Sequence, residues 1–221
     1  MRHAGPAIAV TLACVMQPAH AREASSETAA RVFWDFAKCS VDRHSVSSRE
    51  LLDSYTDDKA GWDAANAFAQ KHSRCLVPGD KLTMDDSLFI GALAGAYFFK
   101  KYKDKPLPDY SQLEPLIDEQ ELKQKADVKT VQRLLFLAFG DCVFRNRSNE
   151  VRQLLSTRPA SDDERKAFDT ITPILGYCLP VEEGGQIKFS RISLRSIFGE
   201  VAYKVDSKLT TRAVAAREVT N

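Results

Sequence analysis

The chain has 221 residues, a formal net charge of +1, 44% hydrophobic residues and 28% charged residues. This composition is typical of a globular protein, and the length suffices for one sizeable core or two small ones. The balanced charge provides no long-range attraction for nucleic acid or an anionic membrane surface, so we expect neither as a partner.

The N-terminal 21 residues are typical of an export signal. Arg2 and His3 precede an apolar stretch over residues 7–16, and Ala19 and Ala21 are small residues at the positions that a signal peptidase recognises. The apolar stretch is shorter than the roughly 20 residues of a membrane-spanning helix. We predict cleavage after Ala21, a periplasmic or secreted mature chain covering residues 22–221, and no membrane span within it.

Cleavage removes Cys14 and leaves four cysteines, the number that two disulfides need. Cys39 and Cys75 stand 36 positions apart, and so do Cys142 and Cys178. Three pairings are possible, and the matched spacing favours Cys39 with Cys75 and Cys142 with Cys178, while crossed pairings stay open. A zinc site is less favoured, because no pair has the close spacing of zinc ligands.

Two parts of the chain align with each other when the sequence is shifted by 103 residues. The shift superimposes cysteines and a Leu-Leu pair, and after a three-residue insertion it superimposes two Ala-Tyr pairs: Cys39 on Cys142, Leu51-Leu52 on Leu154-Leu155, Cys75 on Cys178, and Ala96-Tyr97 on Ala202-Tyr203. Such self-similarity indicates a structural unit that occurs twice. We therefore predict two helical repeats, residues 22–102 and 127–206.

Each repeat is predicted to contain four helical pieces, because apolar residues recur at helical spacing and strand signals are few. The first piece carries an aromatic stripe and ends at the first cysteine. The second is short and carries the Leu-Leu pair, and the third runs from an Asp-Asp pair to the second cysteine. The fourth runs from Thr83 to about Tyr102 in the first repeat and from Ser190 to about Val205 in the second.

Capping residues mark the predicted helix starts. Four hydroxyl residues stand three positions before an acidic residue, as in a capping box: Ser47, Thr83, Ser111 and Ser161. The acidic pairs 57–58, 85–86 and 162–163, together with Asp127, also lie at helix starts, where negative charge is favourable. We interpret these carboxylates as caps, because neighbouring residues on a helix point apart and do not form a glycosidase-like pair.

Residues 103–126 connect the repeats. A charged linker over residues 103–109 contains Pro106 and Pro108, and a helix is expected from Ser111 to about Lys125. Residues 207–221 are expected to form a polar C-terminal tail. Because a short helical module cannot bury its apolar face alone, we predict one compact all-α domain. Its two disulfide-bonded copies are packed either around a pseudo-twofold axis or as stacked solenoid units.

The run from Leu88 to Phe99 is the most apolar segment of the mature chain, and it carries Gly91 and Gly95 four positions apart. At 12 residues it is too short to span a membrane, so we predict a buried central helix. The equivalent helix of the second repeat contains charged residues and is expected nearer the surface.

Tyr97 and Tyr203 occupy equivalent positions in the two repeats and are the candidate ligand-binding residues. In the alternative interpretation both are core rings whose hydroxyl groups reach a polar partner. Only His44 and His72 follow the cleavage site; His44 is expected in a polar loop, and His72 is expected to half-cover the core with its ring edge exposed. Neither is expected to be catalytic.

Motifs for a nucleophile elbow, a zinc protease, a P-loop or a dinucleotide site are missing from the sequence. We therefore predict no catalytic residue, no metal site and no cofactor. The pattern favours a protein that is not an enzyme, although it leaves that question open.

The segments Cys-Leu-Val-Pro-Gly at 75–79 and Cys-Leu-Pro at 178–180, with the Ala-Tyr-bearing helices behind them, resemble a group of uncharacterised exported proteins of sphingomonad-like alphaproteobacteria. That resemblance implies a two-repeat helical protein and no particular activity. The 75–79 segment, with Thr83 and the apolar helix after it, is also similar to periplasmic immunity proteins that neutralise secreted cell-wall amidases.

These observations lead to one expected function and two alternatives. We expect a non-enzymatic binding or interaction module of the periplasm, which holds a protein, a peptide or a small apolar ligand in the groove between the repeats. The first alternative is an immunity-type inhibitor of a secreted cell-wall enzyme. The second is an envelope hydrolase that uses an Asp or Glu together with His44.

Overall fold

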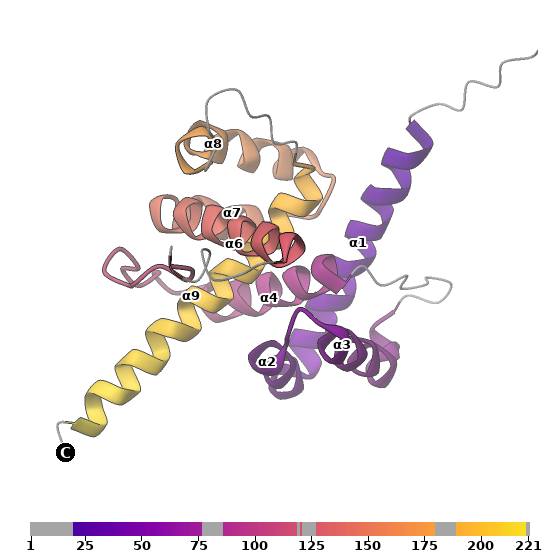
Figure 1. Ribbon diagram of the computed structural model, residues 1–221. Coiled ribbons are helices and arrows are strands. Elements are labelled where there is room, and N and C mark those ends of the chain that lie inside the picture. The colour runs from indigo at the N-terminus through magenta and orange to yellow at the C-terminus, as the bar shows by residue number, and fades with distance from the viewer. Residues whose placement is uncertain (1–19, 77–85, 119, 121–126, 180–188, 220–221) are drawn as a thin grey trace, which may run out of the picture.

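The computed structural model describes residues 20–76, 86–118, 120, 127–179 and 189–219, and within these ranges it contains helices and no strand (Figure 1). The prediction of a compact all-α protein is confirmed. The helices are α1 His20–Arg43, α2 Ser45–Ser54, α3 Lys59–Lys71, the 3-10 helix η1 Ser73–Cys75, α4 Asp86–Tyr102, α6 Val128–Asn146, α7 Ser148–Ser156, α8 Asp162–Cys178 and α9 Arg191–Val219. The predicted signal segment lies outside the described residues, apart from the start of α1.

Short polar side chains begin three of these helices, as the sequence predicts. The Asp58 carboxylate accepts a hydrogen bond from Gly61 N, Asp127 accepts one from Thr130 N, and Ser161 Oγ accepts one from Glu164 N. The prediction that Ser47 caps a helix is wrong. Helix α2 already begins at Ser45, and the Ser47 hydroxyl donates to the His44 carbonyl oxygen. Thr83 lies outside the described residues.

The connector is not helical between Ser111 and 118, so the helix predicted from Ser111 is wrong over that stretch. The chain forms turns instead, because its polar groups find partners elsewhere. Asp109 accepts a hydrogen bond from Ser111 N, and Leu116 N donates to the buried Asp141 carboxylate at 3.1 Å. Arg145 donates to the carbonyl oxygens of Leu113 and Glu114. These bonds fasten the connector to α6.

Two further boundaries differ from the prediction. Helices α1 and α6 continue by about one turn beyond the cysteines that were expected to end them. Helix α9 extends to Val219, so residues 207–219 continue a helix where a polar tail is predicted. Figure 1 shows the C-terminal part of α9 leaving the other helices.

The structure contains the two disulfides that the matched spacing favours. Cys39 is bonded to Cys75 with the Cα atoms 5.5 Å apart, and Cys142 is bonded to Cys178 with the Cα atoms 5.6 Å apart. The first joins α1 to η1, and the second joins α6 to the end of α8. Disulfides of this kind are typical of proteins in oxidising compartments. No helix among the described residues is long and apolar enough to cross a membrane.

The core consists of two clusters of buried side chains, and each cluster includes residues from a helix of the other half. Phe33, Phe36, Phe68 and Phe89 dominate the cluster around α1 to α4, which also contains Tyr203 from α9. The cluster around α6 to α9 contains Phe98 and Tyr102 from α4, among many others. Because each cluster takes residues from the far helix, α4 and α9 bind the two halves into one body.

Close contact between α4 and α9 depends on glycine. A Cβ atom on Gly91 would lie 2.0 Å from Ser196 Oγ, and one on Gly199 would lie 2.2 Å from the Gly91 carbonyl oxygen. Helix α4 is therefore the buried central helix that the sequence predicts. The expectation that its counterpart lies nearer the surface is wrong, since every residue from Leu194 to Tyr203 of α9 is buried.

The helix order α1, α2, α3, α4 is followed by the similar order α6, α7, α8, α9, with one disulfide in each half. In Figure 1, α2 and α3 lie at one end of the molecule and α8 lies at the other, with α4 and α9 between them. A duplication as the origin of this arrangement stays a prediction.

Candidate functional site

The two candidate tyrosines meet each other. The rings of Tyr97 on α4 and Tyr203 on α9 pack edge to face, with centroids 5.5 Å apart. Tyr203 is buried, and its hydroxyl donates to Asp53 Oδ1 at 2.5 Å, which ties α9 to α2. Burial, followed by the hydrogen bond to Asp53, raises the pKa of Tyr203 above its ordinary value. The proposed ligand role of these residues stays a prediction.

Tyr97 is half-buried and lines a surface hollow of about 420 Å³ at the end of α4. The other residues around this hollow are polar or charged: Ser45, Lys100, Lys101, Asp104 and Lys105. Lys101 is held by a hydrogen bond of 2.6 Å to the buried Asp206 carboxylate. The hollow thus suits a polar group, with one aromatic ring at its edge.

The two histidines also lie together. The rings of His44 and His72 are stacked with centroids 4.1 Å apart, and Ser47 Oγ lies 3.2 Å from His72 Nε2. Only 6% of His72 is exposed, so the expectation of an exposed ring edge is wrong. The pKa of His72 is lowered, chiefly by burial and to a smaller extent by electrostatic repulsion from His44 and Lys71.

The Ser47 hydroxyl also donates to the His44 carbonyl oxygen at 3.2 Å. The hydroxyl therefore lies equally far from the His44 carbonyl oxygen and from His72 Nε2, between the two helices. We interpret the cluster as a contact that joins the start of α2 to the end of α3.

A more apolar opening lies where the two halves meet. We name it the Trp34 cleft; it has a volume of about 350 Å³ and is lined by residues of α1, α4, the turn after α4, and α7: Trp34, Lys38, Val41, Asp42, Ala96, Phe99, Lys100, Lys103, Leu155 and Ser156. Trp34 and Phe99 are half-buried, so each presents part of its ring to the opening. A volume of this size lies at the lower end of the range for small-molecule pockets.

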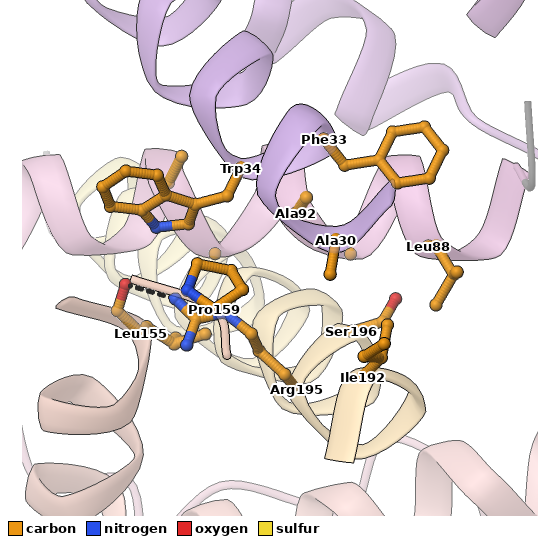
Figure 2. A pocket seen from close by; sticks show the side chains of 13 residues that line it. Ala30, Phe33, Trp34, Leu88, Ala92, Leu155, Pro159, Ile192, Arg195 and Ser196 are labelled. Carbon is orange, nitrogen blue, oxygen red and sulfur yellow. Dashed lines mark hydrogen bonds between the residues drawn. The ribbon is translucent and has the colours of Figure 1, made fainter. Parts of the chain in front are cut away.

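The cleft narrows inward along α4. Trp34, Ala96 and Leu155 also line an inner hollow that extends to Gly91 and Ser196, where about 30 Å³ is open, room for about one or two water molecules. Figure 2 shows Trp34 and Phe33 coming from α1 on one side of this hollow, with Leu155, Pro159 and Arg195 on the other. This end of the cleft therefore has room for little more than water.

Arg195 forms part of the inner wall and is fixed by five hydrogen bonds to α7, α8 and the turn between them. It donates to the carbonyl oxygens of Leu154, Leu155 and Thr157, to the Thr157 hydroxyl, and to Glu164 Oε1 at 3.0 Å. Burial lowers the pKa of Arg195 to about 10, although Glu164 opposes the shift, so the guanidinium stays charged at neutral pH. Its donors are committed to the fold.

The outer rim of the cleft is basic. Three lysines and one aspartate line it, in a chain whose overall net charge is +1. Lys100 Nζ donates to the Val41 carbonyl oxygen at 2.8 Å and lies 3.6 Å from Asp42 Oδ1. Lys100 thus interacts with the C-terminal end of α1. Lys38 Nζ lies 5.1 Å from the centre of the Trp34 ring. All three rim lysines are exposed, and Lys100 is the one that bonds to the end of α1.

The sequence alone does not reveal this cleft. Trp34 belongs to the aromatic stripe of the first helix, together with Phe33 and Phe36, and such a stripe predicts packing in the core. The signal was in the alignment of the halves: Trp34 aligns with Leu137, which is buried, and Phe99 aligns with Val205, which is also buried. At both positions the first half has an aromatic ring where the second half has a buried aliphatic residue. The two halves therefore differ at the cleft.

Among the described residues, no group of three or more histidine, cysteine, aspartate or glutamate side chains is placed to hold a metal ion. In comparisons with known proteins, the chain matches no family model, no curated protein and no solved structure.

Proposed function

We propose that this chain is an exported, non-enzymatic binding protein that holds its ligand or a partner segment in the Trp34 cleft. The observation that carries the proposal is the pair of half-buried rings, Trp34 and Phe99, facing a hollow of about 350 Å³ between the two halves. Partly exposed aromatic side chains in a concave site are typical of ligand binding. Export is supported by the two disulfides and by the signal-like N-terminus.

The test is recovery of bound molecules from the cells that produce the protein. Native mass spectrometry of the wild type is expected to reveal a bound species whose occupancy falls at least about tenfold in the double variant Trp34→Ala/Phe99→Ala. The matched control is Trp62→Ala, which removes a ring that is 43% exposed on α3, away from the cleft. Equal occupancy in the cleft variant and the control would overturn the proposal.

A second double variant, Tyr97→Ala/Tyr203→Ala, separates the cleft from the neighbouring hollow. By helical spacing, Ala96, Phe99 and Lys103 share one face, while Tyr97, Lys101 and Asp104 share the next. Loss of the bound species in the tyrosine variant, with retention in the Trp34→Ala/Phe99→Ala variant, would move the binding site to the Tyr97 hollow.

A further inference from the structure

The chemistry of the Trp34 cleft identifies a class of ligand. We infer that the cleft binds a single-chain amphiphile with an anionic head group, specifically a long-chain carboxylate. Its alkyl chain would lie against Trp34, Ala96, Phe99 and Leu155, and its carboxylate would lie between Lys38 and Lys103. This inference rests on the proposed function, because it names the ligand of the same cleft.

The wall of the cleft favours an alkyl chain over a peptide. An extended peptide brings an N–H and a C=O group for every residue, and each needs a partner when it is buried. The inner part of the cleft instead presents the Trp34 ring, the Ala96 methyl group and the Leu155 side chain, which offer such groups little. Arg195, a charged residue that lines the inner hollow, already donates to α7 and α8. An alkyl chain has no polar groups that would need hydrogen-bond partners there.

The size of the cleft favours one chain. Its volume of about 350 Å³ is at the lower end for ligand pockets, and the hollow beyond it has only about 30 Å³ open. The methyl end of the ligand would therefore stop near Ala96 and Leu155, where the cleft narrows. A two-chain lipid needs more room than this.

The rim sets the sign of the head group. Lys38 and Lys103 are exposed at the mouth, and Lys100 neutralises Asp42 at 3.6 Å. The mouth thus carries an excess of positive charge beside an apolar wall, and a carboxylate placed between two ammonium groups forms charge-assisted hydrogen bonds. A cationic head group at the same place would be repelled by the two lysines.

Trp34 provides the readout. The chain contains two tryptophans, so in the variant Trp62→Phe the fluorescence comes from Trp34 alone. We would titrate this protein with decanoate, hexanoate, decanol and decyltrimethylammonium, each below its micelle concentration. Decanoate is expected to saturate and to shift the Trp34 emission to the blue. Hexanoate lacks four methylene groups and is expected to bind about 250-fold more weakly, since each buried methylene contributes about fourfold. Decyltrimethylammonium is expected to bind at least about tenfold more weakly.

Charge variants on the same background test the rim. Lys38→Gln/Lys103→Gln is expected to weaken decanoate about tenfold and to leave decanol unchanged. The control Lys59→Gln/Lys71→Gln removes the same charge from α3 and is expected to change neither. Equal affinity for decanoate and decyltrimethylammonium would overturn the anionic head group. An unchanged Trp34 spectrum with every alkyl compound would overturn the amphiphile.

These outcomes separate the ligand class from the proposed function. If no alkyl compound binds, yet a species from the producing cells still depends on Trp34 and Phe99, the cleft is a binding site for something else and only the inference on ligand class fails. If that species is also insensitive to the cleft variants, both fail.

Discussion

Helices α4 and α9 both pass through the centre of the molecule, yet they are built from different kinds of residue. Helix α4 buries an almost wholly apolar face that includes Phe89, Leu93 and Phe98. Helix α9 is just as buried over its middle but carries Arg195, Glu200 and Asp206 there. The difference shows that charges on a helix do not place it at the surface when neighbouring elements supply partners for them.

The partners of the α9 charges come from both halves of the molecule. Arg195 pairs with Glu164 of α8, and Glu200 pairs with Lys204 at 2.9 Å and with Arg133 of α6, which also reaches Asp57 of the first half. Burial alone would raise the pKa of Glu200, but Lys204 and Arg133 lower it below its ordinary value. Asp206 accepts from Lys101 and from the hydroxyl groups of Tyr102 and Tyr110. These pairs fix α9 in one position.

The largest effect is expected when one partner of a buried pair is removed. Glu164→Gln leaves the Arg195 guanidinium buried without an opposite charge, and we expect the free energy of unfolding to fall by about 3 to 5 kcal/mol. Urea denaturation followed by circular dichroism measures the change. The control is Asp162→Asn, which breaks the exposed pair with Arg165 on the same helix and is expected to cost less than about 1 kcal/mol.

The double variant Glu164→Gln/Arg195→Met sharpens this test. Because it removes both charges, it is expected to lose less stability than the sum of the two single variants. Strict additivity, or a loss below about 1 kcal/mol for Glu164→Gln alone, would show that this ion pair does not hold α9 in the core.

The disulfides provide the next test, because each half has one and both span 36 residues. Chain entropy predicts about 3 to 4 kcal/mol for each bridge, so Cys39→Ser/Cys75→Ser and Cys142→Ser/Cys178→Ser should be similarly destabilised. Both tryptophans lie in the first half, so fluorescence reports on that half, whereas circular dichroism reports on all helices. The two signals should change together in both variants, since α4 and α9 join the halves. Separate transitions would contradict the single cooperative unit.

Much of the helical framework could be predicted from the sequence. Cysteine spacing indicates the disulfides, and Asp58, Asp127 and Ser161 mark helix starts, because a cap acts on backbone only three residues away. The connector could not be predicted in this way. Ser111 and Glu114 match a capping pattern, yet the segment bonds to Asp141 and Arg145 of α6, and local sequence does not show those contacts.

The site was harder to predict than the fold for a related reason. Trp34 differs little from Phe33 in a helical pattern, and the cleft beside Trp34 is completed by Leu155 of α7, a residue far away in the sequence. Tyr97 and Tyr203 were identified as an equivalent pair, but their mutual contact follows from the crossing of α4 and α9. The burial of Arg195 likewise depends on Glu164, 31 residues earlier in the chain.

A smaller effect is expected at the glycine contact between α4 and α9. Gly199→Ala places a methyl group against the Gly91 carbonyl oxygen. This oxygen belongs to the backbone of α4 and cannot rotate away as a flexible side chain could, and overpacking of this kind costs about 2 to 3 kcal/mol. The matched control is Gly176→Ala in α8, where an added Cβ meets nothing within 4 Å. That variant is expected to be slightly stabilised, by about 0.5 to 1 kcal/mol, because alanine favours a helix. Thermal denaturation of both proteins checks the sign, and equal effects would contradict the close approach of the helices.

The smallest effect is the pH dependence that His72 contributes. Its pKa in the folded protein is lowered, chiefly by burial and then by His44 and Lys71, from the ordinary value of 6.5. Above pH 6.5 the histidine is neutral in both states and its contribution is complete. As the pH falls below that value, the unfolded chain takes up the proton first, so the free energy of unfolding decreases until the folded state also binds it.

We expect the free energy of unfolding to decrease as the pH falls below 6.5, because the pKa of His72 is lowered in the folded protein. Urea denaturation between pH 5 and 7 measures this decrease, and His72→Gln, which keeps a polar group near Ser47 but does not titrate, should show a shallower dependence. Arg195, with a pKa of about 10, stays charged between pH 5 and 7. Its guanidinium therefore does not contribute to the pH dependence of the free energy of unfolding in this range. The acid-sensitive difference between the two proteins would thus belong to the α2–α3 contact of the first half. Identical slopes in both proteins would contradict the burial of His72.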